Sequence, residues 1–332
     1  MQVVHAAGHA RHAPQFFLVR GRVAPSEERP ERAERLLAAA IAAGLEPVEA
    51  APAARADLLA THRPDYLRFL EDAAGQWAAL GDAGPEVVAN VHPVRRGGTY
   101  PRSLIGRAGW HMADAACPIG PHTFAAAALS AGVALRAADI VLAGAPAAYA
   151  LCRPPGHHAY PDMAGGFCFL NNAALAAERL RGAHGRVAIL DIDVHHGNGT
   201  QACFWERDDV LTVSVHVDPA DYYPFFWGYA HERGRGRGEG CNLNLPLPRG
   251  SDDAVWLAAL DEGLAAVRGF ASGALVVALG LDAHAADPLA GMTVTTAGFA
   301  RAGAAIAACG LPTVLVQEGG YLSPALDVNL AA

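Results

Sequence analysis

Short apolar runs alternate with longer segments of helical spacing along most of the chain. Apolar runs of strand length occur at residues 1–4, 147–152, 187–190, 210–215, 274–280 and 312–316. Such runs are typical of strands buried on both faces of a parallel sheet. Amphipathic or alanine-rich stretches predict helices at residues 31–43, 57–60, 64–74, 123–143, 171–180, 251–270 and 297–308. The alternation predicts an α/β fold with a central, mostly parallel sheet flanked by helices.

Segments rich in glycine, proline and aromatic residues separate these elements. Residues 5–25, 81–109 and 218–240 are expected to be loops. The sequence shows no internal repeat and no long linker, so residues 1–332 are expected to form a single domain. The last residues, 329–332, fall where a final helix is expected to continue, which suggests a short C-terminus.

Composition narrows the class of protein. Of the 332 residues, 52% are hydrophobic and 17% are charged, which is enough to build a large core. The formal charge of −8 offers no basic face for a nucleic-acid backbone. The six cysteines form no CxxC pair and are expected to be reduced thiols. Without a signal-peptide pattern or a long apolar span, the expectation is a soluble cytoplasmic protein with no membrane partner.

Candidate metal ligands follow two of the predicted strands. In RVAILDIDVHHGNGT, Asp193 and His195 leave the end of a strand on the same side. Asp282 follows the strand at 274–279 and can supply a third ligand. An Asp₂His set suits Zn²⁺, with Fe²⁺ as an alternative, and leaves positions open for water and substrate. His284 is either a fourth ligand or a residue at the rim of the site.

Two further strand ends carry candidate catalytic groups. The turn Pro154-Pro155-Gly156 presents His157 and His158 in tandem, and neutral imidazole can move protons at physiological pH. After the last strand, the double glycine of VLVQEGGYL leaves the backbone free to turn Tyr321 inward. Its phenol could donate to a developing oxyanion, although a place in the core or at the rim is the alternative.

The motifs CRPPGHHA, GGFCFLNN, DIDVHHGNGT, LDAHAADP and EGGY, in this order and spacing, resemble the histone deacetylase superfamily, which shares its fold with the arginases. The resemblance spans essentially the whole chain. It is closest to the bacterial acetylpolyamine amidohydrolases, because of the loop before PERAERLLAAA, PVRR at 93–96 and DPADYYPFFWGYAHERGRG.

The resemblance implies a role for each candidate residue. Asp193, His195 and Asp282 would hold the metal, and Tyr321 would polarise the acyl carbonyl together with it. In the family the first histidine of the tandem pair contacts an aspartate.

Asp191 matches that aspartate, and Asn198 matches the partner of the second histidine. A neutral Asn198 should raise the basicity of His158 less than a carboxylate would. His158 is therefore expected to be the principal base and acid, with His157 as its electrostatic partner.

The family's structural potassium ion would lie beneath the zinc, on Asp191, Ser214 and main-chain oxygens that include the one of Val215. Phe167 and an aromatic residue of the run 222–226, taken as Phe225, would line a narrow channel for the substrate. Asp114 is the acidic candidate for the amine of a polyamine, but an alignment shifted by two residues would place Ala116 there.

The resemblance thus implies a zinc-dependent amidohydrolase that releases acetate from acetylated polyamines or similar small acetylated amines. Residues 5–25 would help to form a homodimer that narrows the channel. The alternatives are a deacetylase of acetyl-lysine in proteins and a non-catalytic protein that binds acylated amines. The sequence does not identify the preferred amine or acyl chain.

Overall fold

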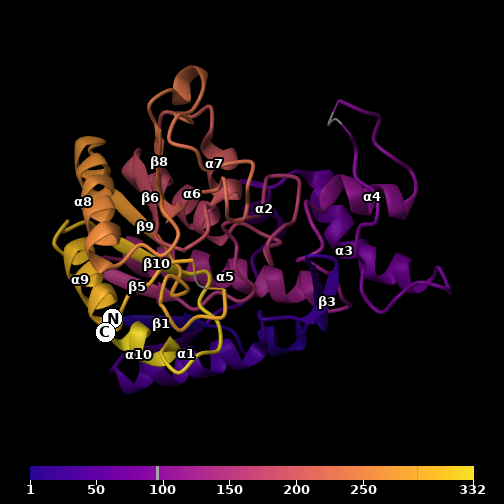
Figure 1. The fold of residues 1–332 in the computed structure, drawn as a ribbon, viewed down its shortest axis with the longest axis horizontal. Coiled ribbons are helices and arrows are strands. Elements are labelled where there is room, and N and C mark those ends of the chain that lie inside the picture. Colours follow the sequence, from indigo (N-terminus) through magenta and orange to yellow (C-terminus); the bar gives the residue numbers. More distant parts are fainter. Residues whose placement is uncertain (95–96, 290) are drawn as a thin grey trace.

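The computed structural model describes residues 1–94, 97–289 and 291–332, so the two arginines of PVRR lie outside the described residues. Eight strands form one sheet: β1 (Gln2–His5), β4 (Glu46–Glu49), β5 (Ala147–Ala150), β6 (Val187–Asp191), β7 (Val210–Val217), β8 (Asn242–Leu247), β9 (Ala274–Leu279) and β10 (Thr313–Gln317). Their order is β4-β1-β5-β10-β9-β6-β7-β8, and each neighbouring pair is parallel. Figure 1 labels β1, β5, β10, β9, β6 and β8 in this order across the molecule. The predicted α/β fold with a parallel sheet is confirmed.

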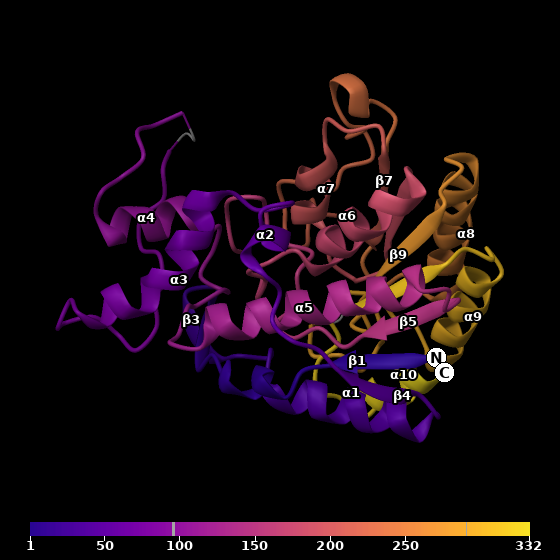
Figure 2. The ribbon, with the colours of Figure 1, turned by 180° about the vertical axis from the view of Figure 1, so that it is seen from behind.

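Helices cover both faces of the sheet. One face packs against α1 (Pro30–Ala42), α8 (Asp253–Gly269), α9 (Thr296–Ala307) and α10 (Leu326–Ala331). The other packs against α5 (Thr123–Leu142), α6 (Asn172–His184) and α7 (Asn198–Phe204), with α5 lying along this face in Figure 2. Successive residues of β6 point to opposite faces, so that Leu190 joins the first cluster and Ile189 the second. The central strands are therefore apolar at nearly every position.

A third cluster extends the molecule beyond the sheet. It joins α2 (Arg55–Leu58), α3 (Pro64–Ala78), α4 (Leu104–His111) and the first half of α5 around buried residues such as Met112 and Phe169. Figure 1 shows α3 and α4 at the end of the molecule opposite α8 and α9.

Two predicted loops contain regular structure. Residues 5–25 include a 3₁₀ helix, η1 (Ala7–Arg11), and an antiparallel hairpin of β2 (Phe16–Val19) and β3 (Arg22–Pro25). Arg20 and Gly21 join its strands with φ of 50° and 73°, the left-handed pair that tight hairpins need. Residues 81–109 include most of α4. The prolines and glycines of this segment had favoured the prediction of a loop. The loop 218–240 contains only a short 3₁₀ helix, η2 (Gly236–Gly238).

The sequence analysis missed β4 and β8, which are the two edge strands of the sheet. Their sequences are EPVE and NLNLPL, and neither is a continuous apolar run. An edge strand is paired on one side only, so it tolerates proline and polar residues that a central strand would exclude. The signal used to find strands is therefore absent where burial is incomplete.

Among the described residues, α5 alone is long and apolar enough to cross a membrane, and 72% of its most apolar window is buried, as expected of a core helix.

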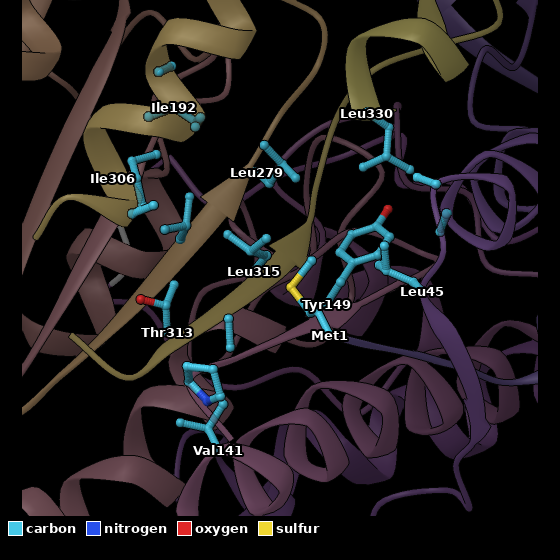
Figure 3. A pocket seen from close by; sticks show the side chains of 18 of the residues that line it. Met1, Leu45, Val141, Tyr149, Ile192, Leu279, Ile306, Thr313, Leu315 and Leu330 are labelled. Carbon is cyan, nitrogen blue, oxygen red and sulfur yellow. The ribbon is translucent and has the colours of Figure 1, made fainter. Parts of the chain in front are cut away.

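An apolar cavity of about 650 Å³ lies between the sheet and helices α1, α9 and α10 (Figure 3), lined by residues such as Tyr149, Leu279 and Ile306. None of its lining residues is a predicted site residue.

Candidate active site

The predicted site residues gather at one end of four adjacent strands. His157 and His158 follow β5, Tyr321 follows β10, Asp282 follows β9, and Asp193 follows β6. These strands are neighbours in the order β5-β10-β9-β6. Because the strands are parallel, their carboxyl ends meet at the same edge of the sheet, which is where open α/β sheets place their ligand sites.

Asp193, His195 and Asp282 form a group whose ligand atoms all lie within 4.8 Å of one another. Both carboxylates are fully buried, and Asp282 Oδ2 has no hydrogen-bond partner in the described part of the chain. Burial opposes the charged form of His195, yet Asp193 and Asp282 raise its pKa to about 9. Two buried carboxylates with an imidazole, in so negative a field, suit a divalent cation.

Glycine is required where the chain after β10 passes this group. A Cβ on Gly319 would collide with the carboxylates of Asp282 and Asp193. With no side chain there, the Gly319 amide donates to Asp193 Oδ2 at 2.7 Å. The amide of Val194 donates likewise to Asp282 Oδ1 at 3.1 Å. Main-chain donors thus orient both carboxylates, and Asp282 Oδ2 is left without a hydrogen-bond partner in the described residues.

The two tandem histidines have different partners. His157 Nδ1 lies 2.9 Å from Asp191 Oδ2, and His158 Nδ1 donates to Asn198 Oδ1 at 2.6 Å. Their rings are 4.0 Å apart, centre to centre. The loop that presents them is held by Glu318, which accepts from the amides of Gly156 (2.6 Å) and His157 (3.0 Å).

These environments move the two pKa values in opposite directions. Burial opposes a charged His157, but the carboxylates of Asp191 and Asp193 outweigh it and raise its pKa to about 10. For His158, burial, followed by the neighbouring His157 and His195, lowers the pKa well below the usual value. The carboxylates beside His157 thus favour its charged form, whereas the surroundings of His158 favour a neutral imidazole. Because Nδ1 of His158 donates to an amide oxygen, its Nε2 carries the free lone pair.

Tyr321 is buried beneath α1. The guanidinium carbon of Arg32 lies 4.7 Å from the centre of its ring. Arg32 also donates to the main-chain oxygens of Gly320 (2.6 Å) and Glu318 (2.7 Å), while the Tyr321 amide donates to Asp287 (2.7 Å). Burial raises the pKa of the phenol far above its usual value, so the phenol remains a proton donor.

Four aromatic side chains, Phe167, Tyr222, Tyr223 and Phe225, surround the polar groups, and we call them the aromatic slot. The ring of Phe167 lies 5.8 Å from Tyr321, and that of Tyr223 4.9 Å from His158. Tyr222 stacks on His195 at 5.0 Å. The Phe225 ring is 48% exposed and lies 6.3 Å from Tyr223. The four rings therefore extend from the buried Tyr321 to the exposed Phe225.

Two members of the slot have strained backbones. Phe167 has φ of 69° and Phe225 has φ of 64°, a region that non-glycine residues rarely adopt. Such conformations persist where the surrounding structure imposes them, and they cluster at functional sites.

Asp114 lies behind the slot and faces protein donors. Its Oδ2 accepts from the Tyr223 hydroxyl at 2.6 Å and from the Gly166 amide at 3.2 Å, and its Oδ1 accepts from the Ala116 amide at 2.8 Å. Ala116, the alternative to Asp114 in the sequence analysis, has no polar side chain.

Asp191 and Ser214 are register partners on β6 and β7. Together with His196, Asn244 and others they line a small cavity of about 10 Å³. Val215 follows Ser214 on β7 and is fully buried. The side chains that the resemblance assigns to potassium are thus adjacent.

His284 is not part of the metal group. It is only partly buried, and its Nδ1 accepts from the Ala286 amide at 3.0 Å.

Four residues that contact the site were not singled out from the sequence: Arg32, Tyr222, Tyr223 and Glu318. The aromatic run at 222–226 was the one available signal for the two tyrosines, whereas no sequence signal marks Arg32 as buried.

Fold and site together define a metal-binding α/β enzyme with a tandem histidine pair. The histone deacetylase domain model matches residues 26–332. The chain is 50% identical to the acetylpolyamine amidohydrolase of Burkholderia pseudomallei, over 96% of this chain and 93% of that protein. It is 43% identical to the acetylpolyamine amidohydrolase of Mycoplana ramosa, over 100% of this chain and 98% of that protein.

A solved structure of acetylpolyamine aminohydrolase from Burkholderia pseudomallei superposes with a TM-score of 0.97 at 48% identity, covering 100% of this chain and 96% of that one. The protein belongs to the histone deacetylase family. The resemblance inferred from the motifs, and with it the assignment to the metal-dependent amidohydrolases, is confirmed.

Proposed function

We propose that the protein hydrolyses the amide bond of acetylated polyamines or similar small acetylated amines, releasing acetate and the free amine. One observation carries the proposal: beside a group fit for a divalent cation, two adjacent histidines are held by different partners, His157 by the carboxylate of Asp191 and His158 by the amide of Asn198. Neighbouring imidazoles in such different surroundings can divide two tasks between them, one acting as the base and the other as its electrostatic partner.

Asp193, His195 and Asp282 would hold the metal, with zinc favoured and iron(II) as the alternative. When bound, a divalent cation polarises a carbonyl and lowers the pKa of water. His158, neutral and with Nε2 free, would take the proton from the attacking water and return it to the leaving amine. His157, which is paired with the carboxylate of Asp191, would stabilise the negative charge that develops.

Tyr321 would donate from its phenol to the acyl oxygen. Its proton is retained at neutral pH because burial raises its pKa. Arg32 fixes the main chain on both sides of Gly319, so the phenol is preorganised and need not be ordered during the reaction.

The preference for small amines is supported by the relatives named acetylpolyamine amidohydrolase. In the proposed enzyme, Phe167 and Phe225 would flank the acyl chain and the aliphatic part of the amine. Deacetylation of acetyl-lysine in proteins is the second candidate, because a histone deacetylase-like amidohydrolase from Pseudomonas aeruginosa is also 40% identical over 96% of this chain. A binding protein without turnover is the third.

Three further expectations belong to the proposal. A potassium ion would be held near Asp191, Ser214 and the main chain of Val215. A homodimer would form through residues 5–25, whose hairpin exposes Leu18 (44%) and Val23 (71%). A cytoplasmic location is expected as well.

The test is acetate release from N-acetylputrescine, N-acetylcadaverine, acetylspermidine and an acetyl-lysine peptide, with zinc-loaded and chelated protein. Chelator-sensitive turnover that favours the small amines would support the proposal. Preference for the peptide would favour the second candidate, and tight binding without acetate release at full zinc occupancy would favour the third.

A further inference from the structure

Both carboxylate oxygens of Asp114 are engaged by the protein itself. Oδ2 accepts from the Tyr223 hydroxyl (2.6 Å), the amide of Gly166 lies 3.2 Å from Oδ2 and 3.4 Å from Oδ1, and the amide of Ala116 donates to Oδ1 at 2.8 Å. Charge-assisted hydrogen bonds of this kind are about twice as strong as neutral ones. Asp114 therefore ties together a side chain of the loop 218–240 and the turn before Phe167.

The ring of Tyr223 forms one wall beside His158. Its centre lies 4.9 Å from that of His158, at an interplanar angle of 89°. Gly166 has φ of 51°, and a Cβ there would collide with His158 and lie 2.9 Å from the Tyr223 hydroxyl. Asn198 holds Nδ1 of the same imidazole. His158 is thus confined on one side by an amide and on the other by a tyrosine that Asp114 fixes.

We infer that Asp114 is a positioning residue for the proposed reaction: its carboxylate fixes Tyr223 and the Gly166 turn, and these set the orientation of His158 and of Phe167. The inference rests on the proposed function and assigns Asp114 a role different from contact with the substrate amine. Burial and the Asp114 carboxylate keep the Tyr223 hydroxyl protonated, since both raise its pKa. The hydroxyl is accordingly a permanent donor to Asp114.

Asparagine should replace Asp114 in this role, but alanine should not. In Asp114→Asn the amide oxygen can accept from the amides of Ala116 and Gly166, and the amide nitrogen can donate to the Tyr223 hydroxyl oxygen. A residue that binds a cationic amine by its charge would lose that contact in both variants. The pair of variants therefore separates geometry from charge.

The experiment measures kcat and KM for Asp114→Ala, Asp114→Asn, Tyr223→Phe and Asp114→Ala/Tyr223→Phe, each loaded with zinc and checked for zinc content and Tm. The substrates are N-acetylputrescine, which carries a distal ammonium, and the neutral N-butylacetamide. Asp221→Asn is the matched control, because Asp221 is an exposed acid on the loop 218–240, which also carries Tyr223.

Asp114→Ala and Tyr223→Phe should each lower kcat about tenfold or more on both substrates, the fold-change expected from losing a hydrogen bond to a charged group. Asp114→Asn should recover most of that loss, and the double variant should be no slower than Asp114→Ala. Asp221→Asn should behave as the wild type.

Hydrogen exchange provides a readout that does not require turnover. In metal-free protein, the amide of Gly166 should exchange faster in Asp114→Ala than in the wild type or in Asp221→Asn. If neither substrate is turned over by wild-type protein, the proposed function fails while this measurement still tests the positioning role.

Three results would overturn the inference. The first is a rise in KM for N-acetylputrescine alone, equal in Asp114→Ala and Asp114→Asn. The second is a double variant whose loss is the product of the single losses. The third is unchanged exchange at Gly166.

Discussion

Arg32, on the first helix, stacks over the ring of Tyr321, which follows the last strand of the sheet, at 4.7 Å from guanidinium carbon to ring centre. The same guanidinium donates to the main-chain oxygen of Gly320. A residue from the N-terminal part of the chain thus fixes the position of the Tyr321 side chain near the C-terminus. Glu28 completes the arrangement, since it pairs with Arg32 and Arg153, each at 2.9 Å, and is fully buried.

Tyr321→Phe should remove the proposed donor to the acyl oxygen and little else. We expect kcat to fall by roughly 10² to 10³, as when one oxyanion donor is lost. Acetate-release kinetics on zinc-loaded protein would measure this loss, with metal content as the control. Retained turnover would exclude the role assigned to the phenol.

Asn198→Asp should change the pH dependence of the reaction. A carboxylate opposite Nδ1 favours charged His158 and should raise its pKa by about 1 to 3 units. Because the base must be neutral, the acidic limb of the kcat/KM profile should move to higher pH. A profile that keeps its acidic limb, with zinc content unchanged, would argue against His158 as the base.

Glu28→Gln should leave two buried guanidinium groups without their carboxylate. Removing one partner of a buried ion pair costs about 3 to 5 kcal/mol, and we expect a loss of that size in the free energy of unfolding, measured by denaturant titration. Burial opposes the charged form of Glu28, but Arg153 and Arg32 outweigh it and lower its pKa in the folded protein.

The contribution of Glu28 should accordingly be present above the ordinary pKa of a glutamate and be lost as the pH falls toward the lower folded value. The exposed pair of Arg237 and Asp208 offers the control, since Asp208→Asn should change stability little. Equal losses in the two variants would contradict the importance of the buried cluster.

Gly319→Ala should weaken metal binding, because the added methyl group would collide with the carboxylates of Asp282 and Asp193. We expect at least a tenfold loss of zinc affinity, comparable with the loss of a residue that orients metal ligands. Competition titration with a chromogenic chelator would measure it. Gly182→Ala is the control, since a Cβ there would meet no described atom within 4 Å.

Removal of the metal should destabilise the protein, since a ligand at 100 times its Kd adds about 2.7 kcal/mol to the stability of the folded state. Thermal unfolding of chelated and zinc-reloaded protein would show this as a reversible decrease in Tm. An unchanged Tm would indicate that Asp193 and Asp282 do not hold a metal.

Much of this protein could be predicted from its sequence, because the information is local. Central strands are apolar on both faces, so their runs are visible in the chain, and β6, β9 and β10 were all found. The candidate site residues could be found because they directly follow these apolar runs. His158, Asp193, Asp282 and Tyr321 each follow such a run, and parallel strands bring their carboxyl ends to one edge.

Only the tertiary structure could decide what depends on partial burial or on distant partners. The edge strands β4 and β8 are paired on one side, so no apolar run identified them. Nothing near Arg32 in the sequence shows that it would be buried and that Tyr321 would lie beneath it. Spacing along the chain also did not show that the carboxylate of Asp114 faces the hydroxyl of Tyr223, because that pairing depends on how two separate loops fold over the sheet.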